Sequence, residues 1–258
     1  MARVLIGTIA LEMNRWSNRV PSYKVSDWLS RFNNDGFDGM ELWENHVIHE
    51  VSEGEAAKIK DLGFPVSVYN TYALFGEDDA EKRKNAAKMI EYFNVDAVKF
   101  NVGDDLTQID VYKSNLLEFA DTIPSKCRLL CECHGGTILD DNKIAKDFFT
   151  DLPEGKFGII IHPFDSVASL QEKFDMFGSR ITHVHSQLQR IENEKTLRLR
   201  LDEWPEHVSA CFDVFRKYNF CGSFTIEFTG GTASVGENID TLYENALADM
   251  AFIRKNLL

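Results

Sequence analysis

Apolar runs alternate with amphipathic stretches along the whole chain. Each short run of apolar and β-branched residues predicts a buried strand, and each following stretch has the 3.6-residue period of a helix that packs on one side. The expected strands lie in the runs Val4–Leu11, Gly39–Trp43, Val66–Thr71, Ala97–Val102, Arg128–His134, Gly158–Asp165, Ile181–Gln187 and Phe224–Gly231. One expected helix begins near Val25, and the others cover Gly54–Leu62, Asp78–Phe93, Gln108–Thr122, Asn142–Phe149, Val167–Phe177, Trp204–Tyr218 and Asn238–Asn256.

Strict alternation of strands and helices calls for a parallel sheet with helical crossovers. A chain of 258 residues has the usual size of one (β/α)8 barrel, although a doubly wound open sheet would also alternate. Polar residues recur at the carboxyl ends of the second, fifth, sixth, seventh and eighth strands, and a closed barrel brings all of these ends into one mouth. We therefore predict an α/β fold with a single (β/α)8 TIM barrel domain over residues 1–258, since no Pro/Gly/Ser-rich linker marks a boundary.

The net charge, the first residues and the length of the apolar runs indicate the expected partners and the cellular location. A net charge of −13 disfavours binding along a nucleic-acid backbone, which requires a basic surface, so a small molecule is the expected partner. The first residues enter an apolar strand without a cleavage site, and no apolar run is long enough to span a bilayer, so we expect a cytoplasmic protein without membrane contact. The five cysteines are an odd set without paired spacing, which indicates reduced thiols.

Four of the strand-bearing runs carry residue types that bind metals near their ends. Glu227 follows one apolar strand, and Glu132, His162 and His185 occupy matching places in three earlier runs. A buried carboxylate without a partner is costly, and side chains that alternate along a strand can converge inside a barrel. Two carboxylates and two imidazoles suit one divalent ion such as Mn, Co, Zn or Fe, with Mg less favoured. The alternative is a set of separate structural residues, with Lys99 as the counter-ion of an interior glutamate.

Several motifs also resemble a known family, the xylose-isomerase-like (β/α)8 barrels, which comprise sugar isomerases, epimerases and dehydratases together with apurinic endonucleases. The resemblance covers the whole chain and rests mainly on Gly36-Phe37-Asp38-Gly39-Met40-Glu41-Leu42-Trp43, the Glu132 strand, Thr182-His183-Val184-His185 and Thr225-Ile226-Glu227. It implies that Glu132, His162, His185 and Glu227 hold one divalent ion. It further implies that Glu132 and Glu227 flank the substrate as acid and base.

The sixth strand departs from the family pattern. The family usually has an aspartate, two residues and then a histidine, whereas this chain has His162-Pro163-Phe164-Asp165, the same pair in reverse order. The resemblance then implies that His162 ligates the ion, which favours Zn, Co or Fe over Mg, and that Asp165 hydrogen-bonds a substrate hydroxyl. Glu41, Trp43 and His134 are the other expected substrate contacts, with Trp43 either stacked on a sugar or buried in the helix layer.

Proton abstraction next to a carbonyl is the chemistry that the resemblance implies, so we expect a metal-dependent isomerase or epimerase of a sugar, sugar phosphate or polyol. The alternatives are a barrel that binds a carbohydrate or a partner protein without catalysis, and a metal-dependent phosphodiester hydrolase like the endonuclease branch.

Two glycine turns, Gly135-Gly136-Thr137 and Gly230-Gly231-Thr232, could cradle a phosphate, but no arginine clearly accompanies them. The polar stretch from Arg190 to Arg200 is expected to be a solvated loop, or else a lid. Small barrels of this kind often associate, so a homo-oligomer is compatible with the sequence.

Overall fold

A closed barrel of parallel strands forms the centre of the computed structural model, which describes residues 2–192 and 194–257. Neighbouring strands around the barrel follow the chain from β1 to β7, and β10 pairs with both β7 and β1 to close it. The barrel strands are β1 Val4–Gly7, β2 Met40–Trp43, β3 Val66–Asn70, β4 Ala97–Phe100, β5 Arg128–Glu132, β6 Phe157–Ile161, β7 Ile181–Ser186 and β10 Ser223–Ile226. This confirms the predicted (β/α)8 fold.

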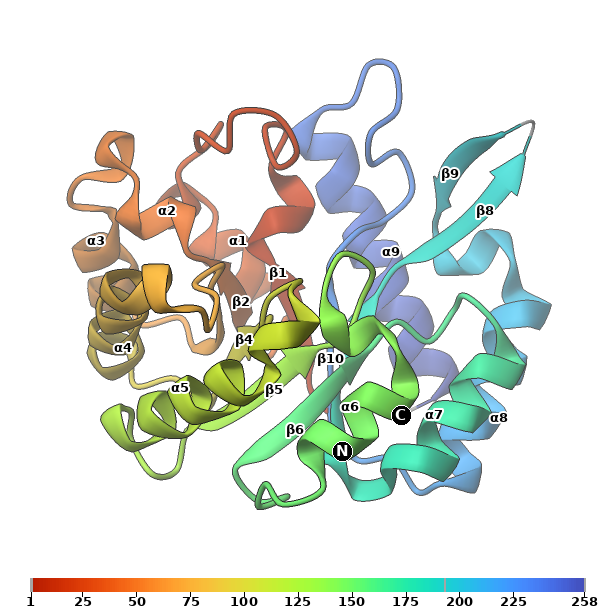
Figure 1. Cartoon of the computed structure of the whole chain (residues 1–258). Helices are drawn as coiled ribbons and strands as arrows, with labels where there is room; N and C mark the ends of the chain where they lie inside the picture. The colour runs from red at the N-terminus through yellow and green to blue at the C-terminus, as the bar shows by residue number, and fades with distance from the viewer. Residues whose placement is uncertain (1, 193, 258) are drawn as a thin grey trace.

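Helices surround the barrel and connect its strands (Figure 1). They are α1 Leu29–Asn34, α2 Asn45–Ile48, α3 Glu55–Leu62, α4 Ala80–Phe93, α5 Ile109–Thr122, α6 Asn142–Phe149, α7 Val167–Phe177, α8 Pro205–Lys217 and α9 Ile239–Asn256. The short helix α2 was not predicted, and the others fall within a few residues of the expected positions. In the part of the chain that the structure describes, no helix is both long enough and apolar enough to cross a bilayer.

Local sequence signals set the ends of these helices. The Asn238 side chain accepts a hydrogen bond from the Thr241 backbone N–H at 3.0 Å and so caps the start of α9. Helix α3 ends at Gly63, which has a φ of 73° in the left-handed region that favours glycine. Helix α9 then buries Leu242, Ala246 and Ile253, three of the positions that its predicted 3.6-residue period places on one face.

Side-chain alternation along the strands divides the barrel interior into an apolar layer and a polar layer. The apolar layer consists of five buried side chains, those of Leu5, Val68, Ala97, Leu130 and Ile160. Two positions further along four of these strands lie Asn70, Lys99, Glu132 and His162. Because residues two apart share a strand face, these polar side chains also point into the barrel, nearer its carboxyl-terminal mouth. The strand pattern therefore positions the polar site.

The stretch expected to be a solvated loop is instead an antiparallel hairpin. It consists of β8 Leu188–Glu192 and β9 Lys195–Leu199, with Gln189 opposite Arg198 in the register. Figure 1 shows this hairpin projecting from the barrel on the side where the loops after β1 and β10 lie. The hairpin is a two-stranded sheet separate from the barrel.

The cysteines are all free, as the spacing predicted, and Cys127, Cys131 and Cys211 are buried. Burial raises the pKa of the Cys127 and Cys211 thiols to about 11. These thiols are therefore protonated at neutral pH and contribute apolar packing.

Candidate metal centre

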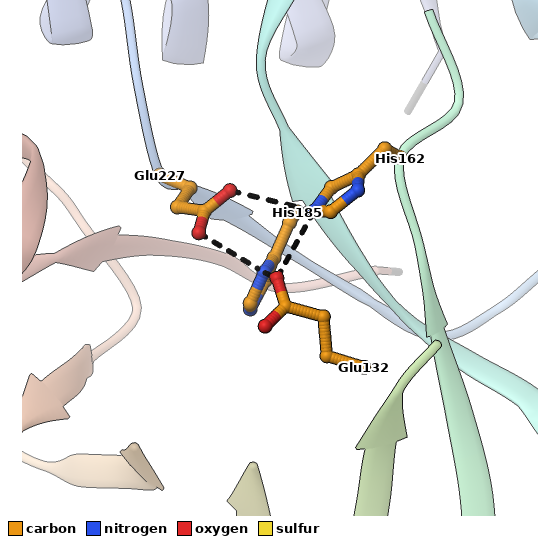
Figure 2. Close-up of side chains that lie close together, drawn as sticks. All are labelled: Glu132, His162, His185 and Glu227. Atoms are coloured by element: carbon orange, nitrogen blue, oxygen red, sulfur yellow. Dashed lines mark hydrogen bonds and ion pairs between the residues drawn. The ribbon is translucent and has the colours of Figure 1, made fainter. Parts of the chain in front are cut away.

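Four side chains converge at the mouth of the barrel from four strands that are adjacent around it. They are Glu132, His162, His185 and Glu227, and each offers one atom within a group that spans at most 4.8 Å. Figure 2 shows their polar atoms directed toward one another. Glu132 Oε1 lies 3.1 Å from His162 Nε2 and 3.0 Å from His185 Nδ1, and Glu227 Oε1 lies 3.4 Å from the same His185 nitrogen. The predicted set of four therefore forms one cluster.

The electrostatics of the cluster favour positive charge at its centre. Burial lowers the pKa of His162, but its contacts with Glu132 and Glu227 outweigh burial and raise that pKa to about 9. Burial raises the pKa of Glu227, but the His185 charge and the contacts with both imidazoles lower it to about 2. Two ionised carboxylates in a buried site thus require compensation, either by protons on the imidazoles or by a cation.

One atom of the cluster lacks a partner among the described residues. Glu227 Oε2 is buried and accepts no hydrogen bond, although His162 Nε2 lies 3.5 Å away. A buried carboxylate oxygen without a partner is costly, and a divalent ion would satisfy it. The donor set of two imidazoles and two carboxylates also suits Zn, Co, Fe or Mn better than Mg. The residues present therefore fit the metal that the sequence predicts.

Lys99 fixes one of the two carboxylates from below. Its ammonium group lies 2.8 Å from Glu132 Oε2 and donates a hydrogen bond to Asn101 at 2.7 Å. Asn101 in turn donates to the Glu132 backbone carbonyl at 2.7 Å. This confirms the prediction that Lys99 is the counter-ion of an interior glutamate. Glu132 Oε1 faces the two imidazoles, whereas no lysine among the described residues pairs with Glu227.

A third carboxylate, that of Glu41, lies deeper in the barrel behind His185. Glu41 Oε2 lies 3.1 Å from His185 Nε2 and 3.2 Å from His183 Nε2, and its other oxygen accepts a hydrogen bond from Asn70 at 2.7 Å. His183 also contacts the hydroxyl groups of Ser223 and Thr225. A carboxylate that accepts from the far nitrogen of a histidine fixes its tautomer and orients the other nitrogen toward a metal. Glu41 therefore holds His185 with Nδ1 toward the cluster.

Above the cluster lies a pocket of about 440 Å³. Glu132, His162 and Glu227 form part of its wall, together with Lys99, and the rest is formed by Ile9, Arg15, Trp16, Arg19, Tyr72, His134, Gln187, Gln189, Arg198 and Phe228. Aromatic rings and amide groups around a concave polar floor are typical of a site for a small polar molecule. The pocket is thus large enough for a monosaccharide-sized ligand.

Of the four expected substrate contacts, one lines the pocket and three lie elsewhere. His134 lines the pocket, with its Nε2 3.5 Å from Glu132 Oε2. Among the described residues, the other three are not part of the pocket lining. Glu41 lies behind His185, and Trp43 is fully buried and packs with Ile9 and Phe228. Asp165 is exposed and accepts a hydrogen bond from Gln189 at 3.3 Å.

Sequence reasoning missed several pocket residues because they lie outside the barrel strands. Arg15 and Trp16 follow the 3-10 helix Thr8–Leu11, and Arg198 belongs to the hairpin strand β9. The signal that could have revealed β9 is a period of two, in which Leu197 and Leu199 alternate with Arg198. Nothing in the pattern indicates that the hairpin folds toward the mouth.

The space beside the glycine turn after the last barrel strand is occupied by other parts of the protein. A Cβ atom on Gly230 would lie 3.0 Å from the Arg200 backbone nitrogen, and Asn245 donates a hydrogen bond to the Gly230 carbonyl at 2.7 Å. Close packing therefore accounts for this glycine without a phosphate.

A larger cavity, of about 730 Å³, lies at the opposite end of the barrel. Its lining includes Arg3, Asp96, Arg128 and Gly222, which lie at the amino-terminal ends of the strands. None of the four clustered residues lines it. Since catalytic sites of (β/α)8 barrels lie at the carboxyl-terminal ends of the strands, the smaller pocket is the candidate site.

The similarity of this chain to known proteins lies in its structure. No protein-family profile matches the sequence, and no curated protein matches it. The probable 3-DHS dehydratase AsbF involved in petrobactin synthesis, from Bacillus anthracis, has 18% identity and a TM-score of 0.69, and the match covers 99% of both chains.

Two further solved structures share the fold over nearly the whole length. The IOLI protein, solved with a binding zinc atom, has 12% identity and a TM-score of 0.65 over 98% of this chain and 99% of that one. Endonuclease IV from Thermus thermophilus has 11% identity and a TM-score of 0.62, with the same coverage. Other matching structures are described as xylose isomerase-like barrels. At these identities the likeness concerns the fold, and the protein has the fold of the xylose-isomerase-like (β/α)8 barrels, as its motifs predict.

Proposed function

We propose that this chain is an enzyme that uses one divalent metal ion to isomerise or epimerise a carbohydrate by proton abstraction next to a carbonyl group. The observation that carries the proposal is the convergence of Glu132, His162, His185 and Glu227 at the barrel mouth, with Glu227 Oε2 buried and lacking a partner among the described residues. The zinc atom in the IOLI protein, which has the same fold, supports the metal. Aromatic and amide side chains around the pocket support a carbohydrate ligand.

The four clustered residues would hold the ion, with His185 contributing Nδ1 because Glu41 engages its other ring nitrogen. A bound divalent ion supplies Lewis acidity, which polarises a substrate carbonyl and stabilises the negative charge that develops on its oxygen. Lys99 holds Glu132 in a fixed orientation through a 2.8 Å ion pair, so Glu132 does not turn away from the pocket.

The two carboxylates would move the proton. Glu227 is the stronger candidate for the base, because it lines the pocket and, unlike Glu132, it is not held by an ion pair with Lys99. After Glu227 has taken a proton from the carbon next to the carbonyl, Glu132 delivers a proton drawn from solvent. Delivery to the opposite face of that carbon gives an epimer. Delivery to the former carbonyl carbon, together with transfer of the neighbouring hydroxyl proton to the former carbonyl oxygen, gives an isomer. Positioned groups of this kind contribute about 10²–10⁴-fold to the rate.

Incubation with a panel of ketoses and inososes in D₂O tests the mechanism directly. With Zn, Co, Fe or Mn added, we expect conversion of at least one sugar and uptake of deuterium at the carbon next to the carbonyl, followed by NMR. Glu227→Gln should slow both by at least about 10²–10⁴-fold, because the amide cannot accept the proton and is also a weaker ligand for the metal ion. Glu244→Gln is the matched control, since Glu244 is an exposed residue of α9.

The outcomes separate the competing functions. Conversion without deuterium uptake would contradict delivery of a solvent proton by Glu132, and a metal-loaded protein that converts none of the sugars would contradict the isomerase or epimerase function. Cleavage of abasic DNA would instead favour a phosphodiester hydrolase, which the net charge of −13 disfavours.

A further inference from the structure

The β8–β9 hairpin contributes a cation to the pocket. Arg198 of β9 and Gln189, the residue opposite it on β8, both line the pocket beside Glu227. Arg198 is therefore placed above the cluster by an element that lies outside the barrel. Glu192 and Arg190, on the same hairpin, form an ion pair with each other and do not line the pocket.

Two aromatic rings hold the Arg198 side chain in position. Its guanidinium carbon lies 4.7 Å from the ring centroid of Trp16 and 4.8 Å from that of Phe228. The two rings also contact each other, with centroids 5.2 Å apart. A guanidinium group over aromatic faces is attracted to them and keeps its hydrogen-bond donors available at its edge. The side chain is thus preorganised without being neutralised.

Arg198 lacks an anionic partner within residues 2–192 and 194–257. No carboxylate lies within ion-pair distance of it, and its Nε atom is buried without a hydrogen-bond acceptor. The other buried cations of the pocket are already engaged. Arg15 pairs with Glu237 at 2.6 Å and donates to two backbone carbonyls, and Lys99 pairs with Glu132.

A buried guanidinium Nε–H without an acceptor, such as that of Arg198, is costly, and an anion bound there would accept its hydrogen bond. Burial lowers the pKa of Arg198, because the charged guanidinium is partly removed from water. The negative charge of Glu227 raises this pKa but does not cancel the effect of burial. A second arginine, Arg19, is exposed at the rim of the same pocket, where it stacks on Tyr72. Arg198 and Arg19 therefore place positive charge on the pocket lining, contributed by segments other than those that carry the four clustered residues.

We infer that the substrate of this site is an anionic carbohydrate, whose carboxylate or phosphate group binds Arg198 while its carbonyl end faces Glu132 and Glu227. The inference rests on the proposed function for the carbonyl end, whereas the anion site rests on Arg198 alone. The planar guanidinium can donate two parallel hydrogen bonds to either anion, which gives it orientation as well as affinity.

Calorimetric titration of the full chain supplemented with Zn²⁺ tests the inference. The probes are fructose, tagatose and xylulose, each supplied as the neutral ketose, as the acid with a terminal carboxylate, and as the terminal phosphate ester. We expect at least one anionic form to bind about tenfold or more tightly than its neutral parent. Arg198→Gln should remove that preference, and Arg198→Lys should restore part of it because the charge remains. Arg190→Gln is the matched control, as it removes the same charge from the same hairpin outside the pocket.

Each outcome decides the inference. Equal binding of neutral and anionic forms, or binding of none, would overturn it, and so would an anion preference that survives Arg198→Gln. A preference for the acid over the ester, or the reverse, identifies the anion. If ketoses are converted but the anionic forms have no higher kcat/KM than the neutral parent, and Arg198→Gln leaves the kcat/KM of the anionic forms unchanged, the inference fails while the proposed function stands. If the anion binds through Arg198 but no probe is converted, the anion site stands and the proposed function fails.

Discussion

The carboxylate of Glu41 is buried behind His185 and shared by two imidazoles. We predict that Glu41→Gln weakens metal binding by about 10- to 100-fold, because the amide no longer holds the His185 ring with Nδ1 toward the cluster. Competition with a chromogenic chelator measures the metal affinity, and Glu244→Gln serves as the control. An unchanged metal affinity combined with a raised KM would instead favour the direct substrate contact predicted from the sequence.

At the scale of single residues, the sequence predicts that the four clustered residues converge, whereas three of the four expected substrate contacts lie away from the pocket lining among the described residues. Glu132, His162 and His185 could be identified because strand alternation and position at a strand end determine where a side chain points. The substrate contacts depend on how loops fold over the mouth. Trp43 is an example. Its position near a strand end is compatible either with stacking on a sugar or with burial in the helix layer, and in the structure it is completely buried.

At the scale of elements, one buried acid joins three segments around the site. Asp249 of α9 accepts hydrogen bonds from the Leu201 backbone N–H at 2.7 Å and from the Thr229 hydroxyl at 2.5 Å. Leu201 begins the 3-10 helix Leu201–Glu203 that follows the hairpin, and Thr229 follows β10. Burial raises the pKa of Asp249 to about 7 in the folded protein.

This raised pKa predicts a pH-dependent stability. The folded chain keeps the Asp249 proton at pH values where the unfolded chain has lost it, so the contribution of Asp249 is fully present below about pH 4. It is lost as the pH rises toward the folded pKa of about 7 and changes little above that. The slope is about 1.4 kcal/mol per pH unit. Asp249→Asn removes this slope, because the amide does not ionise.

Thermal unfolding of the two proteins between pH 5 and pH 8, which covers most of the range in which the contribution of Asp249 is lost, measures the effect. We expect the Tm of the original chain to fall relative to that of Asp249→Asn as the pH rises. Glu244→Gln on the same helix should show no such relative change. Parallel Tm curves for the original chain and Asp249→Asn would show that Asp249 does not titrate in this range.

The hairpin shows why some elements escape prediction from sequence. Its strands carry mostly polar side chains, and Ile191 and Leu197 are exposed, so no apolar face distinguishes the segment from a solvated loop. Its position depends on tertiary contacts of Arg198 with Trp16 and Phe228, which come from opposite ends of the chain. Local patterns do not contain such long-range contacts.

At the scale of the whole molecule, the barrel can be predicted from the sequence because a unit of one strand and one helix repeats along the entire chain. Strands buried on both faces read as continuous apolar runs, such as Phe157–Ile161, and each amphipathic helix supplies the cover for one strand. The boundaries are less accurate. The first strand ends at Gly7 and continues as a 3-10 helix, whereas the apolar pattern runs on to Leu11. Apolar composition alone does not distinguish the two conformations.

The central claim is that the four clustered residues hold one divalent ion, and elemental analysis of the protein purified without chelator tests it most directly. We predict about one equivalent of Zn, Co, Fe or Mn per chain, lost in Glu227→Gln and His185→Ala but kept in Glu244→Gln, because the cluster supplies the donor atoms that such ions prefer. A folded native protein that binds no metal, even after incubation with each ion, would contradict the metal centre and the proposed mechanism.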